Sequence, residues 1–334
     1  MPCQAGDLRS RTRWPACIWP LALLVVALAA TACGGRPRPA TTAGAIPAGP
    51  QSNMQGAVSA DGSSTVGPLM QLAAEHFGEF TPGVAVTVGV AGTGGGFQRF
   101  CAGETDLSDA SRAIKPEEAA ACRKAGIAYS EITIANDGIS VVVNPHDTWV
   151  SCLTVAQLKQ IWNAGSKVGN WRDLNPAYPS VAMRLYGPGT DSGTFDFFTE
   201  KIDGVADVSR TDYSASEDDN VTVQGVSGDR GGLGYFGLSY AEENASRLKL
   251  LGVDGGKGCV RPSTRTVQDG SYTPLSRPLF VYVKHDAAKR PAVAAFLRYL
   301  VANAGAIARA ARFVPLTVAQ RVTARRELAK AIRA

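Results

Sequence analysis

A glycine-rich stretch from Tyr186 to Thr199 has the residue types of an anion-binding turn. Two glycines around a proline cannot continue a strand, and a serine that suits a helix N-cap precedes three phenylalanines of an apolar helix face. The N–H groups of Ser192, Gly193 and Thr194 would then lack partners within the helix, where the helix dipole also favours negative charge. An ordinary strand–turn–helix joint with a serine cap would have the same residues, so this stretch alone leaves both interpretations open.

Hydroxyl side chains stand in two more segments in which a predicted strand leads through a loop into a predicted helix. The first loop supplies Ser64 and Thr65, and the second, which is rich in glycine, supplies Thr93. The second loop is not a dinucleotide-binding turn, because Phe97 stands where G-x-G-x-x-G requires its last glycine. We therefore expect no cofactor.

A third segment, 105–114, is a short alternation of polar and apolar residues, and Ser111 and Arg112 stand at the end of this alternation. Both residues are expected at the end of a strand, which is the edge of a parallel sheet where ligands bind. A loop arginine is by default a surface residue, so Arg112 is a binding candidate only in company with the other loops.

Composition places the chain among ordinary soluble globular proteins. Its 334 residues are enough for about two domains. Hydrophobic residues make up 45% of the chain, and the formal net charge is +5. Nothing in the charge pattern suggests a nucleic-acid partner. The basic residues of the last predicted helix, 318–333, are interpreted as a solvated face.

The first 33 residues have the features of an export signal. Basic residues precede an apolar run, 18–30, that is shorter than the ~20 apolar residues that span a bilayer. Small residues and Cys33 follow, and this end resembles the lipobox of bacterial lipoproteins. We expect residues 1–32 to be a signal peptide, Cys33 a lipid anchor on the cell membrane, and residues 33–55, rich in Pro, Gly, Ala and Thr, a flexible tether. The protein would then lie outside the cytoplasmic membrane, in the periplasm or on the cell surface.

With Cys33 assigned to the lipid anchor, four cysteines remain after the signal, in an oxidising setting that favours two disulfides. Three pairings are formally possible. Cys101 and Cys122 flank one loop-and-helix segment, which favours Cys101–Cys122 together with Cys152–Cys259. A zinc site is the competing interpretation, but no two of these cysteines have C-x-x-C spacing and the three histidines are scattered, so we expect no metal.

Strand and helix patterns alternate along the chain, which predicts an α/β fold with largely parallel sheets. Two apolar runs, 132–143 and 278–284, are long enough to cross between two lobes with a cleft between them. The first lobe would comprise residues 56–137 and 279–334, and the second residues 138–278. Short strands are also predicted at residues 221–226, 234–238 and 248–253.

Six motifs follow one another along the chain: Asp61-Gly-Ser-Ser-Thr65, Gly92-Thr-Gly-Gly-Gly96, Asp109-Ala-Ser-Arg112, Asn136-Asp-Gly-Ile139, Gly187-Pro-Gly-Thr-Asp-Ser-Gly-Thr194 and Gly234-Tyr-Phe-Gly237. No single motif is specific. In this order they resemble the phosphate-binding proteins of bacterial high-affinity phosphate ABC importers, within the type II periplasmic-binding-protein superfamily. The resemblance covers residues 56–334 and implies a two-lobed fold with two crossover strands as its hinge.

The resemblance also implies a phosphate site that both lobes share. The matched residues are Ser64, Thr65 and Thr93 in the first lobe, and Ser192, Gly193 and Thr194 in the second. Many relatives place an arginine a few residues before the matched serine, where this sequence has Pro188. We therefore expect Arg112, next to Ser111, to supply the bidentate cation from the first lobe.

Phosphate at neutral pH carries at least one proton and sulfate carries none, so a selective site needs a hydrogen-bond acceptor. The acidic residue of the relatives aligns with no acid in this sequence. Asp137, at the first crossing, is the first choice for the replacement, with Asp61, Asp109 and Asp191 as alternatives. The ordinary interpretation of Asp137 is a turn aspartate that bonds its own backbone.

The resemblance implies a monomeric receptor that is not an enzyme. Inorganic phosphate would dock between the lobes, and the closed form would deliver it to the permease subunits of an ABC importer. A phosphatase or serine hydrolase using Ser192 is the alternative, but the sequence has no G-x-S-x-G elbow there, no histidine near the motifs and no metal-ligand cluster. A lipoprotein that senses phosphate or adheres to a surface would share the fold, and fold alone does not decide function.

Overall fold

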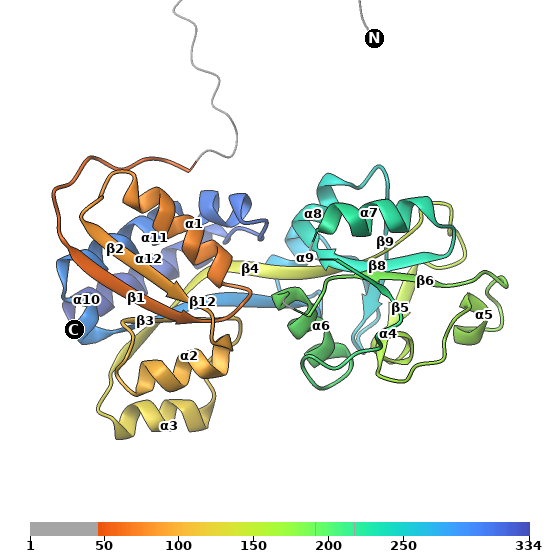
Figure 1. The fold of residues 1–334 in the computed structure, drawn as a ribbon, viewed down its shortest axis with the longest axis horizontal. Helices are drawn as coiled ribbons and strands as arrows, with labels where there is room; N and C mark the ends of the chain where they lie inside the picture. The colour runs from red at the N-terminus through yellow and green to blue at the C-terminus, as the bar shows by residue number, and fades with distance from the viewer. Residues whose placement is uncertain (1–45, 191, 217) are drawn as a thin grey trace, which may run out of the picture. The chain divides into compact units, whose positions relative to one another are not determined.

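The computed structural model describes residues 46–190, 192–216 and 218–334, and Figure 1 shows their arrangement. All of the described helices and strands belong to one compact unit, Thr42–Ala334. The predicted signal peptide, residues 1–32, the lipid anchor Cys33 and residues 33–45 of the predicted tether lie outside the described residues.

The first half of the main sheet forms around β1. This strand pairs in parallel with β2 on one side and β3 on the other, and β12 returns antiparallel beside β3. The strands are β1 (Gly56–Gly62), β2 (Val84–Gly89), β3 (Leu107–Ala110) and β12 (Ser276–Lys284). The helices of this half are α1 (Gly67–Gly78), α2 (Gly92–Cys101), α3 (Pro116–Lys124), α10 (His285–Ala288), α11 (Pro291–Ala310) and α12 (Val318–Arg333).

The side chains of β12 show that helices cover both faces of this half-sheet. Leu279, Val281 and Val283 are buried in a core with α1, α11 and α12, while Phe280 and Tyr282 are buried on the other face with α2 and α3. Because successive side chains of a strand point to opposite faces, an unbroken apolar run is the pattern of a strand that is covered on both. The first lobe is therefore a three-layer α/β domain.

The long strand β4 (Tyr129–Val143) connects the two halves of the sheet. Up to Gly138 it pairs antiparallel with β12, and from Ile139 it pairs with β8 instead. The change of partner takes the chain from the first hydrophobic core into a second one. The protein is thus a two-lobed α/β fold with β4 and β12 as its crossing strands, as predicted (Figure 1).

The second lobe continues the main sheet through β8, β6 and β7, with β9 beside β4, and adds a small sheet in the order β11–β10–β5. Its strands are β5 (Cys152–Thr154), β6 (Arg184–Gly187), β7 (Ser214–Ala215), β8 (Gly232–Gly237), β9 (Lys249–Leu250), β10 (Gly252–Asp254) and β11 (Cys259–Val260). Its helices are α4 (Val155–Trp162), α5 (Trp171–Leu174), α6 (Gly193–Ile202), α7 (Asp219–Gly228), α8 (Leu238–Glu243) and α9 (Thr264–Gln268). Phe198 of α6 stacks on Tyr235 of β8 with ring centroids 3.7 Å apart, which fixes α6 on the sheet.

The prediction of a strand at residues 221–226 is wrong, because these residues lie in helix α7. Asp218 caps that helix by accepting a hydrogen bond from the N–H of Asn220 at 2.9 Å. Val223 and Val226 are both fully buried, three residues apart on the helix. The β-branched residues favour a strand locally, and packing of this face overrides that preference.

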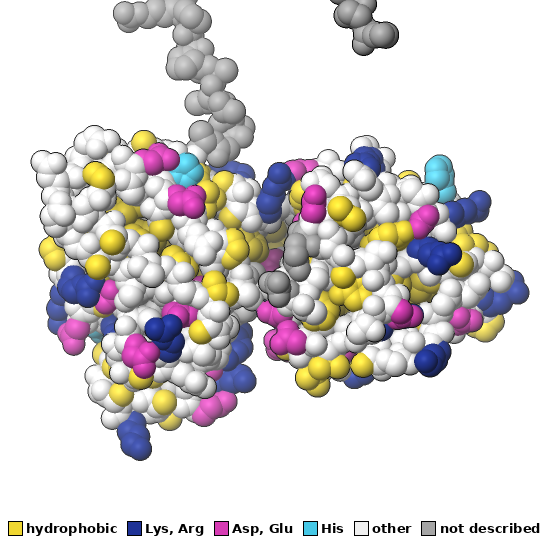
Figure 2. Space-filling model, viewed as in Figure 1, with side chains coloured by type: hydrophobic (Ala, Val, Ile, Leu, Met, Phe, Trp, Pro, Cys, Tyr) yellow, Lys and Arg dark blue, Asp and Glu magenta, His cyan; other side chains and the backbone are white. Residues whose placement is uncertain are grey.

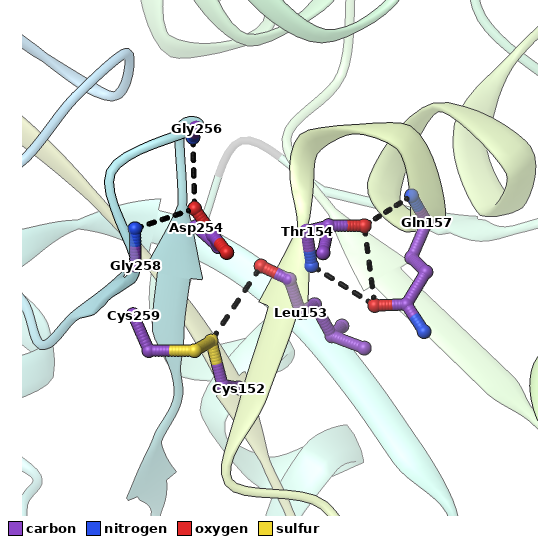
Figure 3. Close-up of a disulfide and its surroundings, with 8 residues drawn as sticks. All are labelled: Cys152, Leu153, Thr154, Gln157, Asp254, Gly256, Gly258 and Cys259. Atoms are coloured by element: carbon purple, nitrogen blue, oxygen red, sulfur yellow. Dashed lines mark hydrogen bonds between the residues drawn. A yellow bond between two sulfur atoms is a disulfide. The ribbon is translucent and has the colours of Figure 1, made fainter.

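Both predicted disulfides are present in the structure. Cys101–Cys122 joins α2 to α3, and Cys152–Cys259 joins β5 to β11 in the small sheet, as Figure 3 shows. Because all four cysteines are paired, the zinc alternative is excluded for them.

By length and composition, α11 is the one helix among the described residues that could cross a membrane, with a hydropathy of 1.4. Eleven of its 20 residues are buried inside the protein. The helix is therefore explained as the core helix of the first lobe.

Residues 46–55 form neither helix nor strand. Ile46 and Met54 pack against the first core, and the N–H of Ser52 donates to the carbonyl of Phe80 at 2.8 Å. These contacts hold the segment on the first lobe.

Candidate functional site

A cleft of about 530 Å³ lies where the crossing strand β12 meets three first-lobe loops and helix α6. Phe197, Pro278 and Phe280 form its apolar wall. Its polar lining consists of Ser63, Ser64, Thr65, Thr93, Ser111, Arg112, Asp196, Glu200, Lys201, Ser276 and Arg277. The structure therefore brings together five of the residues predicted for the site, namely Ser64, Thr65, Thr93, Ser111 and Arg112.

The first loop of the cleft follows β1 directly. It can pass close to β3 because residue 62 is glycine, and a Cβ there would overlap the carbonyl oxygen of Asp109. Ser63 then folds the turn back on itself, since its hydroxyl accepts from the N–H of Thr65 at 3.2 Å. This turn presents Ser64 and Thr65 to the cleft.

The glycines of the second loop lie inside helix α2, which begins at Gly92. A Cβ on Gly96 would come within 2.6 Å of the Cα of Gly62, so glycine lets this helix lie against the first loop. The hydroxyls of Thr93 and Ser111 are 3.1 Å apart, and the N–H of Ser111 donates to Thr93 Oγ1 at 3.2 Å. The start of α2 and the end of β3 thus form one wall of the cleft.

Arg277, which was not predicted from the sequence, is the buried cation of the cleft. Its side chain is 9% exposed, and its Nε donates to Asp137 Oδ2 at 3.1 Å. Its Nη2 donates to the hydroxyl of Thr65 at 2.7 Å and to the carbonyl of Gly193 at 3.3 Å, while Phe197 stacks under the guanidinium at 3.8 Å. Burial lowers the pKa of Arg277 although Asp137 opposes this. The group stays charged, since an arginine ordinarily has a pKa above ~12.

The guanidinium of Arg112 is occupied by another side chain. Its Nη1 and Nη2 each donate to one carboxylate oxygen of Glu118 at 2.8 Å. The hydrogen bond to Glu118 raises the pKa of Arg112 above its ordinary value. The bidentate geometry expected for a ligand is thus directed at Glu118 in this structure.

Ser192, Gly193 and Thr194 stand at the beginning of α6, as predicted, but do not line the cleft. Ser192 is the N-cap, and its Oγ accepts from the N–H of Thr194 at 3.2 Å. The carbonyl of Gly193 accepts from the Thr65 hydroxyl at 3.2 Å. The serine cap is therefore present, and the first lobe stands directly against the start of the helix.

Helix α6 also brings a carboxylate into the cleft. Asp196 lies one turn after Gly193 and accepts from the Ser64 hydroxyl at 2.9 Å. Burial raises the pKa of Asp196 to about 6, and a hydrogen bond with Asp207 adds to the shift. Asp196 is thus a carboxylate of the second lobe that faces the first-lobe loop inside the cleft.

Comparisons with known proteins identify the family. A profile described as PBP superfamily domain matches residues 42–304. The chain is 50% identical to Protein SphX of Synechococcus elongatus over 262 residues, 78% of this chain and 77% of that protein. It is 40% identical to Phosphate-binding protein PstS of Staphylococcus saprophyticus over 265 residues, 78% of this chain and 81% of that protein. The chain belongs to the PstS family of the PBP superfamily.

A solved structure supports the same assignment. The crystal structure of a possible phosphate binding protein from Planctomyces limnophilus is 44% identical, with a TM-score of 0.81, and the match covers 84% of this chain and 99% of that one. The PstS family consists of binding receptors, so the phosphatase and serine hydrolase alternatives are set aside.

Asp137 pairs with Arg277 but does not itself line the cleft of this PstS-family protein, and two of its alternatives, Asp61 and Asp109, lie outside the lining as well. Asp61 accepts from the N–H of Ala91 and pairs with Arg99. Asp109 is fully buried, and its carboxylate oxygens have no hydrogen-bond partner among the described residues. Asp191 is outside the described residues. Burial raises the pKa of Asp109 to about 7, and the charge of Asp61 contributes.

Replacing Asp109 by asparagine is expected to make the protein more stable above pH 7. The carboxyl ionises near pH 3.8 in the unfolded chain and near pH 7 in the folded one. Between these values the unfolded state releases its proton first, so the free energy of unfolding of the wild type falls as pH rises. At about 1.4 kcal/mol per pKa unit the loss reaches at most about 4 kcal/mol. Denaturant unfolding from pH 4 to pH 8 should show the difference between variant and wild type opening over this range. A difference that is independent of pH would contradict the expectation.

Proposed function

We propose that this protein captures inorganic phosphate in the cleft at Arg277 and delivers it to the permease subunits of an ABC importer. The relative from Staphylococcus saprophyticus is named a phosphate-binding protein, and the solved relative from Planctomyces limnophilus a possible one. Proteins of this family act outside the cytoplasm, where such an importer meets its substrate.

The observation that carries the proposal is a buried guanidinium in a cleft that hydroxyl groups from separate loops also line. Arg277 is fixed by Asp137, which leaves a permanent positive group held at the cleft wall. Thr65, in contact with Arg277, and Thr93 and Ser111, elsewhere in the same lining, supply neutral hydroxyl donors. A guanidinium fork fits two phosphate oxygens, and its hydrogen bonds to them are charge-assisted.

In this proposal phosphate replaces contacts that the lobes now make with each other. The Ser64 hydroxyl, which now donates to Asp196, would donate to a phosphate oxygen instead. The Thr65 hydroxyl, which now donates to the Gly193 carbonyl, would do the same. A hinge movement in β4 and β12 then lets the N–H groups at the start of α6, at residues 192–194, face the anion from the second lobe. Arg112 lines the same cleft and would add positive charge near the ligand if it left Glu118.

A carboxylate acceptor would distinguish phosphate from sulfate, because an acceptor facing sulfate meets no proton. Asp137 is one such carboxylate, but its Oδ2 already accepts from Arg277. Asp196 lines the cleft with a hydroxyl as its partner there. The phosphate-over-sulfate preference should be measured in Asp137→Asn and in Asp196→Asn. The variant in which this preference falls identifies the acceptor.

We further propose that the protein is a monomeric lipoprotein held at the cell membrane by lipid on Cys33, after removal of residues 1–32. The lobes divide in this proposal at residues 137/138 and 278/279. The change of strand partner within β4, between Gly138 and Ile139, supports the first of these boundaries.

Calorimetry of the chain from Gly34 to Ala334 tests the central claim. We expect tight binding of phosphate, weaker or no binding of sulfate and molybdate, and no hydrolysis of a phosphate ester. Absence of phosphate binding would overturn the proposal, whereas turnover of an ester would return an enzyme to consideration. Loss of phosphate uptake in cells that lack the protein would separate an import receptor from a sensing or adhesion lipoprotein.

Replacing Gly193 by alanine is expected to weaken phosphate binding. A Cβ on this residue would lie 2.6 Å from the backbone nitrogen of Thr65, so it would keep the start of α6 away from the loop with which it would share the phosphate. Overpacking of this kind costs about 1–3 kcal/mol, which corresponds to about a fivefold to 150-fold loss of affinity. Gly78→Ala is the matched control, because a Cβ there meets no atom within 4 Å. Equal phosphate affinities of the two variants would show that close approach at Gly193 is not needed.

A further inference from the structure

The basic residues of the protein are concentrated at its C-terminal end. Residues 46–334 contain 29 Lys and Arg against 28 Asp and Glu, yet residues 291–334 hold eight of the basic residues and a single acid, Glu327. Glu327 is already paired with Arg326 and Lys330. On the face drawn in Figure 2, by contrast, acidic and basic side chains are interspersed. The helices α11 and α12 therefore form a strongly positive surface on an otherwise slightly negative protein.

A groove of about 320 Å³ runs between these two helices. Its floor contains the buried residues Val301 and Leu328, and no acidic residue lines it. Arg298, Arg325 and Arg333 are exposed at its rim. No hydrogen bond or ion pair engages their guanidinium groups within the part of the chain that the structure describes. The groove thus combines an apolar floor with three uncompensated charges.

The solvent-facing side of α12 also carries apolar residues. Val318 is 68% exposed and Val322 is 59% exposed. Four residues apart, they lie on the same face of the helix, and Arg325 and Ala329 continue that face over the next turns. A helix with exposed valines between arginines has the composition of one that lies in the interface of a membrane.

We propose that α11 and α12 dock this protein on an anionic phospholipid surface. The three rim arginines would bind lipid phosphates, for which guanidinium groups have the matching bidentate geometry, while Val318 and Val322 enter the headgroup region. An acidic protein partner would match the charge as well. The alternation of exposed valines and arginines along one helix face is the pattern of a helix at a lipid surface, and binding of an acidic protein instead is an outcome of the test below. The proposal does not depend on what the cleft binds.

Vesicle sedimentation tests this docking surface. The chain from Gly34 to Ala334 contains both hydrophobic cores and both disulfides, and it lacks Cys33 and any lipid on it, so it is the form to use. We expect it to bind vesicles of phosphatidylcholine mixed with phosphatidylglycerol, to bind vesicles of phosphatidylcholine alone at least about tenfold more weakly, and to be released by high salt.

The deciding variant reverses the charges at the rim: Arg298→Glu, Arg325→Glu and Arg333→Glu together. It should lose at least about tenfold in binding to the anionic vesicles. The matched control, Arg123→Glu, Lys124→Glu and Lys257→Glu, changes the net charge equally at exposed positions elsewhere and should retain most of the binding. Thermal unfolding and phosphate titration that match the wild type show that each variant is folded. If a glutamate variant does not fold, glutamine is used at the same positions.

Three results would overturn the proposal. The first is equal binding of the wild type to neutral and anionic vesicles. The second is an equal loss in the rim variant and the control, which would leave only net charge. The third is binding to poly-glutamate without binding to anionic vesicles, which would assign the groove to an acidic protein partner instead.

Discussion

The variant Arg277→Met should bind phosphate at least about a hundredfold more weakly than the wild type. Each charge-assisted hydrogen bond contributes about 1.5–3 kcal/mol, and the arginine has two or more to give. Its loss also leaves the Asp137 carboxylate unpaired beside the anion, since Asp137 and Arg277 are 3.1 Å apart and both almost fully buried. Calorimetric titration with phosphate measures the loss, and a wild-type affinity would remove Arg277 from the site.

The same substitution should lower the free energy of unfolding by about 3–5 kcal/mol, because it orphans a buried charge. The double variant Arg277→Met, Asp137→Leu removes both charges and should regain most of that stability while still failing to bind phosphate. Recovery of phosphate binding in the double variant would mean that the arginine serves only to neutralise the aspartate.

Arg112→Met is the matched control for the cation. Its guanidinium is held by Glu118 in the structure, so we expect a much smaller loss of phosphate affinity than in Arg277→Met. If the loss in Arg112→Met is as large, Arg112 must leave Glu118 on ligand binding, and the role expected for it from the sequence stands.

The second large effect concerns the disulfide Cys152–Cys259. Replacing both cysteines by alanine should lower the free energy of unfolding by about 5 kcal/mol, against about 3 kcal/mol for the same change at Cys101–Cys122. The reason is loop length, since the first bond joins cysteines 107 residues apart and the second joins cysteines 21 residues apart. Denaturant unfolding of the two variants measures the difference.

The small sheet around Cys152–Cys259 has local support that could reduce this effect. Asp254 accepts from the N–H groups of Gly256 and Gly258, and Thr154 forms a capping box with Gln157, as Figure 3 shows. These bonds order the turn and the helix without the disulfide. A smaller loss in the Cys152, Cys259 variant than in the other would show that local order, and not loop length, governs the stability here.

Much of the fold follows from periodicity. The alternation of strands and helices and the two long apolar runs were sufficient to predict two lobes joined by crossing strands. Residues 221–226 were assigned wrongly because valine and threonine favour strands in isolation, while the cap at Asp218 and burial against the sheet decide for a helix.

The sequence predicted the hydroxyl residues of the candidate site but not its buried arginine. Ser64, Thr65, Thr93 and Ser111 could be found because each follows a strand, and such ends meet at one edge of a sheet. Arg277 is 212 residues from Thr65 in the chain and follows no glycine-rich loop. The available signal was its position immediately before Pro278, at the start of a crossing strand, where a charged residue is costly to bury without a partner.

The way β4 changes partner has a consequence for how the chain assembles. Apart from Val314, the second core is drawn from one continuous stretch, Ile139 to Leu275, whereas the first core joins Val58 to Ala331. During synthesis the middle of the protein therefore has its packing partners before its beginning does. The strands β1 and β2 have α1 as an early partner, but their core is not complete until α11 and α12 follow, and until then part of its apolar surface stays exposed. A chain cut short after residue 275 would retain nearly all of the second core and lose the helices that close the first.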